Sequence, residues 1–393
     1  MKISIKNFGP IDHFEFDLEK DLHVIYGENN IGKSWAISIA YLLLKFWKDK
    51  SDICFEYAKG KSNKGFNTKY IGITGDFNIT LDNTFGEMKN LISGLQPEII
   101  IDTNILKVKL ERHEEEITEE GFYPETFEGI YTLSEDFIKN EIKRLSNNFE
   151  NLYFLPASKS GIYQVLSNMG NIFAQLSQYQ IKNKSLSLPS LSIPVSDYIL
   201  NIAAINSSKQ GEFGSFVDFL EGKVIEGSVI FDDFQKKLKY KSNRTGLVSE
   251  FYEASSMIAE ISPLVAYLKY ILPKKNSILF IEEPEAHLHP KVQVEMMKIF
   301  VDLVKSGVKV VMTTHSDFMM NELSNALLAK EIDAEKVASY HLKMGEKGSF
   351  DAGDMKATSE GIEDYNFTDV AIQQYERRIE ILEKLNQDAV RQD

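Results

Sequence analysis

The segment "HVIYGENNIGKS", at residues 23–34, constrains the fold of this chain more than any other stretch. Its last eight residues fit G-x-x-x-x-G-K-[ST] at every fixed position, the pattern of a loop that binds the phosphates of a nucleotide. Residues 22–26 form an apolar strand segment that leads into the loop. After Lys33 the apolar residues follow a helical pattern through Leu44. The motif therefore lies between a strand and a helix, which predicts an α/β fold with a nucleotide site.

Two carboxylates end a second apolar strand, residues 278–281, within the segment "SILFIEEPEAHLHP". A continuous apolar run of this kind is typical of a central parallel strand. Beside a phosphate loop, Glu282 is expected to hold magnesium through water, and Glu283 to orient the water that attacks the γ-phosphate. His287 and His289 could also form part of a zinc site, but the H-E-x-x-H spacing is absent. We interpret this stretch as a loop that follows the catalytic carboxylate.

A third strand, residues 310–312, ends in "TTH". A histidine at the end of the next strand, His315, can donate a hydrogen bond to the γ-phosphate and so sense whether that phosphate is present. A lone histidine is more often structural, but its position after this strand favours the functional interpretation. Glu283 and His315 are therefore the predicted catalytic residues.

The composition of the chain limits its possible partners and cellular location. The chain has 393 residues, a formal net charge of −14 and one cysteine, Cys54. The acidic balance argues against indiscriminate binding to nucleic acid or anionic membrane, and one cysteine permits no internal disulfide. The longest apolar helix candidate, residues 36–47, is shorter than the about 20 residues that span a bilayer, and the first residues do not resemble a signal peptide. We expect a soluble, cytoplasmic protein with no membrane partner.

The middle of the chain changes character twice. Residues 70–110 alternate apolar and polar side chains, which predicts an antiparallel sheet beside the nucleotide core. Residues 165–222 are rich in Ser, Asn and Leu, and we predict that they are mostly helical, followed by a hairpin. The chain ends in a predicted helix whose apolar stripe, from Ile372 to Leu382, is expected to cover the core.

Six segments together resemble one known group of proteins. They are "IKNFGPI" (5–11), "YGENNIGKS" (26–34), "YFLPASKSG" (153–161), "EASSMIAEISPLVAYLKYIL" (253–272), "FIEEPEAHLHP" (280–290) and "TTHS" (313–316). The chain resembles the ABC-type ATPase heads of the overcoming-lysogenization-defect (OLD) class, also grouped as AAA-15 or AAA-21 ATPases. The match runs over most of the chain, and the phosphate loop combined with "EEPEAHLHP" is its most specific part.

This resemblance implies the fold and its division. It implies an α/β ABC-ATPase head with a mixed central sheet, an antiparallel β subdomain and a mainly helical insertion. The expected parts are an N-terminal ATPase lobe with the phosphate loop and β subdomain, the insertion, and a C-terminal ATPase lobe, at residues 1–165, 166–245 and 246–393. OLD nucleases continue into a metal-binding Toprim domain, and the 78 residues after His315 are too few for one. We therefore expect a stand-alone ATPase.

The resemblance also implies roles for the site residues. Lys33 and the loop amides would hold the β- and γ-phosphates of ATP, and Ser34 and Glu282 would hold Mg²⁺. Ser255 and Ser256 match the signature segment, which contacts the γ-phosphate of ATP bound by a partner head. The expected ATP-binding residues are Gly27, Asn29, Asn30, Ile31, Gly32, Lys33, Ser34, Trp35, Ser255 and Ser256.

Three positions depart from the pattern of the resembled group or stay unassigned. Met257 follows the two serines where a glycine is common, which puts a tight approach of the backbone to phosphate in doubt. Gln164 is only a weak candidate for the glutamine of the usual Q-loop. Relatives often carry a basic residue at the position of Lys159, and its role is open.

The leading functional hypothesis is an enzyme that hydrolyses ATP and uses a homodimer, or higher oligomer, closed around ATP to control a separate effector. The resemblance points to prokaryotic anti-phage defence, with a nuclease or toxin as effector. The alternative is a DNA-engaging repair or recombination ATPase of the RecF or SMC-head type. Its basis is two clusters of basic residues: Lys59, Lys61, Lys64 and Lys69, and Lys236, Lys237, Lys239, Lys241 and Arg244. A small-molecule kinase fits poorly, because lid arginines are not apparent.

Overall fold

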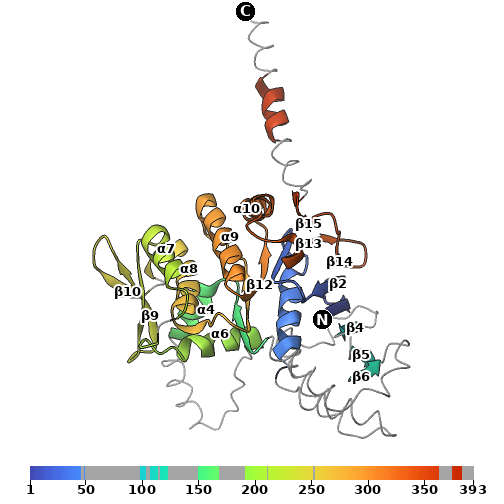
Figure 1. Ribbon diagram of the computed structural model, residues 1–393, viewed down its shortest axis with the longest axis horizontal. Helices are drawn as coiled ribbons and strands as arrows, with labels where there is room; N and C mark the ends of the chain where they lie inside the picture. The colour runs from blue at the N-terminus through green and yellow to red at the C-terminus, as the bar shows by residue number, and fades with distance from the viewer. Residues whose placement is uncertain are drawn as a thin grey trace, which may run out of the picture.

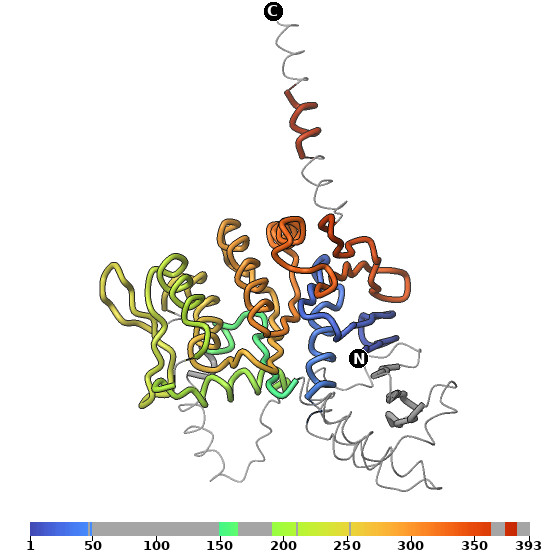
Figure 2. The backbone as a smooth tube through the Cα atoms, viewed as in Figure 1, coloured from blue at the N-terminus to red at the C-terminus, as the bar shows by residue number. Residues whose placement is uncertain are grey.

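The computed structural model describes ten stretches of the chain, at residues 1–45, 48, 98–102, 107–113, 116–122, 149–167, 191–209, 211–250, 253–362 and 374–382. The predicted strands near residues 71–81 and the lysines between 59 and 69 lie outside these stretches. Figure 1 shows the arrangement of the described elements, and Figure 2 the path of the chain.

One mixed sheet organises the molecule. Its strands within the described residues are, in spatial order, β6 (Glu116–Phe122), β5 (Lys107–His113), β4 (Glu98–Asp102), β1 (Lys2–Phe8), β2 (Ile11–Asp17), β14 (Ser349–Asp351), β13 (Val337–Met344), β3 (Leu22–Gly27), β12 (Val308–Thr314), β11 (Ser277–Glu282) and β7 (Asn151–Leu155). From β13 to β7 every neighbouring pair is parallel. From β6 to β2 every pair is antiparallel. The predicted α/β fold with a mixed central sheet is confirmed.

The antiparallel part is continuous with the nucleotide core. Strand β4 pairs with β1, so that β4, β5 and β6 extend the central sheet and do not form a separate layer. The prediction of antiparallel strands in this region is therefore correct in type, and the structure adds how they attach.

The parallel strands are apolar because both faces of the sheet are covered. Ile278 and Phe280 of β11 lie in the core that contains the helix of residues 33–45. Leu279 and Ile281 lie in the opposite core, with α9 (Pro290–Lys305) and α10 (Asp317–Leu328). Each fully buried side chain of this size contributes about 1.5–3 kcal/mol, so these strands are held firmly in register.

The region predicted as a mainly helical insertion contains both helices and strands. Its helical elements are α6 (Ile193–Ala203), α7 (Gly214–Phe219) and η3 (Leu220–Val224). A three-stranded antiparallel sheet follows, formed by β8 (Gly227–Asp232), β9 (Lys237–Ser242) and β10 (Val248–Glu250). These elements pack with α4 (Lys159–Ser167), α8 (Ser256–Ala266) and η5 (Tyr267–Ile271) beside α9 (Figure 1). Residues 198–240 and residues 259–362 thus contribute to one core, which Leu22, Val24, Leu155 and Tyr163 also join.

The remaining elements complete the C-terminal lobe. A short turn, η6 (Ala334–Lys336), precedes β13, and the two-stranded β15 (Ala357–Thr358) and β16 (Gly361–Ile362) pack on α10. The helix of residues 374–382 exposes Tyr375, Ile379 and Leu382, so the expectation that this stripe covers the core is wrong for these positions. No helix within the described residues is long and apolar enough to cross a membrane.

Candidate functional site

The phosphate loop follows β3 and ends in the helix of residues 33–45, as predicted. Gly27, Asn30 and Gly32 adopt positive φ angles of 149°, 62° and 92°. A Cβ on Gly27 would lie 2.6 Å from the carbonyl oxygen of Leu342 in the neighbouring strand β13. Glycine is required there because the chain needs both the unusual φ angle and the close approach of a second backbone.

Lys33 is buried beneath this loop. Its Nζ donates hydrogen bonds to the carbonyl oxygens of Gly27, at 2.8 Å, and Glu28. Burial lowers the pKa of Lys33, and the nearby carboxylates of Glu283 and Glu285 act in the opposite direction. These two hydrogen bonds hold the ammonium group of Lys33 against the loop.

Glu282 ends β11 with its side chain almost fully buried. The N–H of Ala157 donates to its carboxylate at 3.1 Å. Burial raises the pKa of Glu282, whereas the nearby Ser34 hydroxyl, the hydrogen bond from Ala157 and the charge of Lys159 lower it. A serine hydroxyl near a carboxylate offers oxygen ligands of the kind that suits Mg²⁺, so the residues present fit the predicted ion.

Glu283 occupies the first turn after β11, with a positive φ of 42°. Its N–H donates to the carbonyl oxygen of Thr313, at 3.1 Å, and lies 3.3 Å from the Thr313 hydroxyl oxygen. These contacts with β12 fix a backbone conformation that is strained for a residue with a side chain. The carboxylate stays partly exposed and lies 3.8 Å from Nδ1 of His315.

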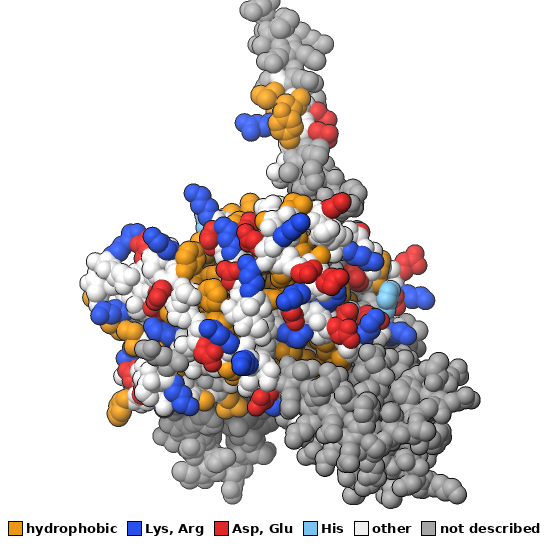
Figure 3. Space-filling view, in the orientation of Figure 1, with side chains coloured by type: hydrophobic (Ala, Val, Ile, Leu, Met, Phe, Trp, Pro, Cys, Tyr) orange, Lys and Arg blue, Asp and Glu red, His pale blue; other side chains and the backbone are white. Residues whose placement is uncertain are grey.

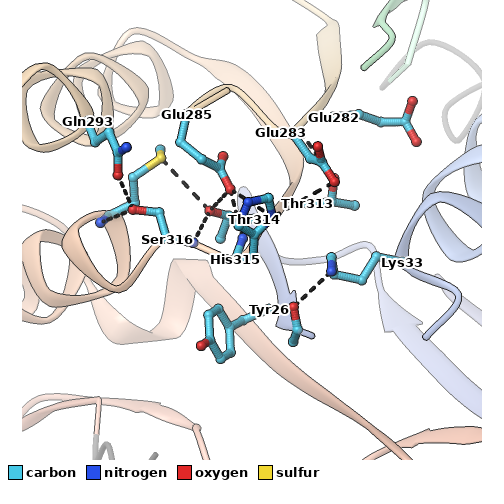
Figure 4. Close-up of polar contacts among 12 residues, drawn as sticks. Tyr26, Lys33, Glu282, Glu283, Glu285, Gln293, Thr313, Thr314, His315 and Ser316 are labelled. Carbon is cyan, nitrogen blue, oxygen red and sulfur yellow. Dashed lines mark hydrogen bonds and ion pairs between the residues drawn. The ribbon is translucent and has the colours of Figure 1, made fainter. Parts of the chain in front are cut away.

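Figure 4 shows how these side chains meet. Glu283 and Glu285 point toward His315, and Lys33 lies below Glu283, whereas Glu282 points away from His315. The four predicted residues come from the carboxyl ends of β3, β11 and β12, which are neighbouring parallel strands. The structure therefore brings Lys33, Glu283 and His315 together, and it places Glu282 at the end of the same strand edge with its side chain turned toward Ala157.

Glu285 is a residue of this site to which the sequence analysis gave no role. Its carboxylate is buried and accepts the hydroxyl of Thr314 and the N–H of His315, both at 2.7 Å. Nδ1 of His315 lies 3.6 Å away, and the other carboxylate oxygen of Glu285 has no hydrogen-bond partner among the described residues. In the sequence Glu285 is recognisable only as an acid two positions after Glu283. Its distance along the chain from Thr314 and His315 does not indicate that it faces β12.

The other predicted ATP-binding residues are spread more widely. Asn29 and Asn30 are exposed on the loop, and Ile31 is buried beneath it. The ring of Trp35 packs edge-on against Phe8, 5.7 Å between centroids, so it covers the turn between β1 and β2. These positions are consistent with a loop whose backbone, more than its side chains, faces the phosphates.

Ser255 and Ser256 lie at the exposed start of α8. The Ser255 hydroxyl accepts the N–H of Ile258, at 3.4 Å, and caps the helix. Helix α8 packs on α4, η5 and β8. His289 also caps a helix, because its Nδ1 accepts the N–H of Lys291 at the start of α9.

Comparison with known protein families identifies the family to which the chain belongs. Residues 103–320, more than half of the chain, match the model of the AAA ATPase domain (AAA_15). The chain belongs to the AAA ATPase domain family. The matched stretch contains Glu282, Glu283 and His315, and the phosphate loop precedes it. Family membership confirms the AAA-15 part of the resemblance and the prediction of an ATPase that binds nucleotide.

One curated relative of this AAA ATPase domain protein is the energy-coupling factor transporter ATP-binding protein EcfA2 of Lactococcus lactis subsp. lactis (strain IL1403). The two are 29% identical over an alignment of 137 residues, and the match covers 29% of this chain and 47% of the relative. The chain thus spans about half the length of the curated relative it matches.

Two solved structures resemble the chain over most of its length. The SMC head domain from Thermotoga maritima has a TM-score of 0.40 at 11% identity and covers 93% of this chain and 98% of its own. The Smc head domain with an extended coiled coil, bound to the C-terminal domain of ScpA from Pyrococcus furiosus, has a TM-score of 0.43 at 12% identity and covers 96% and 98%. At these scores the likeness adds nothing to the family assignment.

Proposed function

We propose that this protein is an ATP-driven switch of the OLD-like type, in which two heads close around ATP and the closed state controls a separate effector. One observation carries the proposal: Lys33, Glu282, Glu283 and His315 lie at the carboxyl ends of three adjacent parallel strands. This is the edge of an α/β sheet at which ligands bind. The arrangement supports hydrolysis more than phosphoryl transfer to a small molecule.

Each residue has one task in this scheme. Lys33 and the loop amides hold the β- and γ-phosphates, and Ser34 with Glu282 would hold Mg²⁺, which when bound neutralises developing phosphate charge. Glu283 orients the attacking water and accepts its proton. His315 donates to the γ-phosphate, and Glu285 fixes the backbone from which it does so.

The second half of each site would come from a partner head. Ser255 and Ser256 are exposed at the start of α8, where hydroxyls and free helix amides attract phosphate. In their own chain the Ser255 hydroxyl caps α8 by accepting the N–H of Ile258. An ATP molecule between two copies would contact the phosphate loop of one copy and the start of α8 of the other. This supports a homodimer or a higher oligomer that forms with ATP.

The effector follows from the resemblance to the OLD class, in which an ATPase governs a nuclease. We propose a separate nuclease or toxin as the partner, a cytoplasmic location and a role in prokaryotic anti-phage defence. Co-purification with proteins encoded by neighbouring genes would identify the effector.

The described part of the chain gives no support to DNA binding. The basic residues on the hairpin of β8 and β9 are largely neutralised by acids, in the pairs Lys236–Asp233 (3.9 Å), Lys237–Glu250 (3.5 Å), Lys239–Asp232 (2.8 Å) and Arg244–Glu226 (2.5 Å). Basic and acidic side chains are also interspersed over the face shown in Figure 3. A phosphate backbone requires an unpaired basic track, which these lysines do not form.

Glu283→Gln tests the proposal directly. This variant keeps hydrogen bonding but cannot accept a proton, so it should bind ATP, hydrolyse it at least about 100-fold more slowly, and accumulate as a dimer with ATP. Lys33→Ala should bind no ATP and stay monomeric under the same conditions. Light scattering with and without ATP reads the dimer, and phosphate release reads hydrolysis. Wild-type hydrolysis by Glu283→Gln would refute the mechanism.

A further inference from the structure

Residues 156–160, which run from the loop after β7 into the first turn of α4, contact Glu282, the predicted magnesium ligand, twice. The N–H of Ala157 donates to Oε2 of Glu282 at 3.1 Å. The ammonium group of Lys159 donates to the carbonyl oxygen of Glu282 at 3.1 Å. This segment therefore fixes both the side chain and the backbone of Glu282.

The same segment also holds α8. Nζ of Lys159 lies 3.9 Å from Oε2 of Glu260, and Ser160 donates to Oε1 of Glu260 through its hydroxyl, at 2.5 Å, and its N–H, at 3.3 Å. Within the part of the chain that the structure describes, Oε2 of Glu260 has no hydrogen-bond partner, and the ammonium group of Lys159 is the charge that balances it. The Tyr198 hydroxyl donates to the carbonyl oxygen of Lys159, at 3.4 Å, and supports the segment from α6.

Both charged side chains are buried, with 3% of the Lys159 side chain and 5% of the Glu260 side chain exposed. Removing two charges from water is costly, and an apolar pair of similar volume would pack these elements as well or better. A buried ion pair with its hydrogen bonds also fixes the relative orientation of the three groups that it joins, which apolar packing does not. Here those groups are the end of β11, the segment of residues 156–160 and α8.

Glu260 also lies one helical turn after Ser256, the residue expected to meet the γ-phosphate of the partner's ATP. A shift at the start of α8 therefore reaches Glu260 along a rigid helix. From Glu260 it passes through Lys159 to the backbone of Glu282. This path links the start of α8, which would contact the partner head, to Glu282 in the ATP site of the same chain.

We propose that Lys159 is a positioning residue that couples α8 to Glu282, so that engagement of the partner's ATP at Ser255 and Ser256 sets the geometry for hydrolysis. This inference rests on the proposed function. Lys159 contacts no reacting atom, and it acts through Glu282 and Glu260. Its loss should lower the turnover of ATP and spare the binding of ATP to the phosphate loop.

Three variants separate coupling from mere structural support. Lys159→Met keeps the length of the side chain and removes the charge, Glu260→Gln neutralises the partner, and the double variant carries neither charge. Lys269→Met is the matched control, because Lys269 also pairs with a partly buried glutamate, Glu221 at 2.7 Å, and donates to a carbonyl oxygen, that of Val229 at 3.0 Å. Turnover, KM for ATP and the unfolding midpoint are measured for each.

Lys159→Met should lower kcat at least about 10-fold and change KM less than about 2-fold. Its unfolding midpoint should fall, because Glu260 loses its balancing charge. The double variant should recover the midpoint but keep the low kcat, since the link to Glu282 is still absent. Lys269→Met should lose stability and keep its kcat.

Two results would overturn the inference. One is a wild-type kcat in the double variant, which would reduce the pair to structural support. The other is an equal loss of kcat in Lys269→Met, which would make the effect one of stability. A wild-type chain that binds ATP and does not hydrolyse it would instead refute the proposed function, and the inference with it.

Discussion

The carboxylate of Glu285 accepts the main-chain N–H of His315 at 2.7 Å. The same oxygen accepts the hydroxyl of Thr314. One buried acid therefore holds the carboxyl end of β12 against the loop that follows β11 (Figure 4). The position of His315 relative to Glu283 is thus set by a third residue. A sensor of the γ-phosphate needs such a fixed backbone, because an error of about 1 Å at a reacting group can cost about 100-fold in rate.

Replacing Glu285 should separate hydrolysis from binding. Glu285→Ala leaves two buried donors without an acceptor, which should destabilise the fold by about 1–3 kcal/mol and lower kcat at least about 10-fold. Glu285→Gln keeps an acceptor oxygen and should retain more activity. Glu295→Ala, an exposed site on α9, is the control. Equal rates for wild type and Glu285→Ala would exclude this role.

The phosphate loop should not tolerate a methyl group at Gly27. In Gly27→Ala the Cβ would clash with the Leu342 carbonyl, and the φ of 149° is unfavourable for alanine, so ATP binding should fall at least about 10-fold. Gly222→Ala has open space around its Cβ and a helical backbone, and it should bind ATP normally. Titration with a fluorescent ATP analogue measures both. Unchanged affinity in Gly27→Ala would show that the loop adjusts.

Two inactive variants should complement each other if the sites are shared. Lys33→Ala lacks the phosphate-binding lysine, and a chain with Ser255→Ala and Ser256→Ala lacks the groups offered to the partner. A mixed dimer contains one intact site, so an equal mixture should hydrolyse ATP faster than either variant alone, at up to about half of the wild-type rate if every chain enters a mixed dimer. The rate is read after mixing at constant total protein. A mixture as inactive as its parts would argue against composite sites.

His23 should make the fold sensitive to acid. Burial and the charge of Lys309 lower its pKa from 6.5 to about 4. Between pH 6.5 and pH 4 the unfolded chain therefore binds a proton that the folded chain does not, so stability rises with pH across this window and is lost as pH falls. The full effect is up to about 3 kcal/mol. Urea unfolding of wild type and His23→Phe over this range tests it. The two curves should diverge at low pH, and parallel curves would contradict the assignment.

Much of the nucleotide site could be predicted from the sequence because its parts are local. The phosphate loop is one short segment, and the strands that carry Glu282 and His315 are continuous apolar runs followed by polar residues. Strands of this kind are buried on both faces and lie side by side, so their ends meet at one edge of the sheet. The mixed central sheet could be predicted from the resemblance to a known family, because the motifs that carry the resemblance are also short local segments.

Three features were decided only by tertiary structure. The strands β4, β5 and β6 join the central sheet through β1, a pairing that alternation of apolar residues does not specify. Glu285 faces Thr314 and His315 because β11 and β12 are neighbours, and Lys159 meets Glu260 across 101 positions of sequence. Sequence patterns report the local period of burial, whereas contacts between distant buried charges depend on how the elements pack, and no local pattern records that.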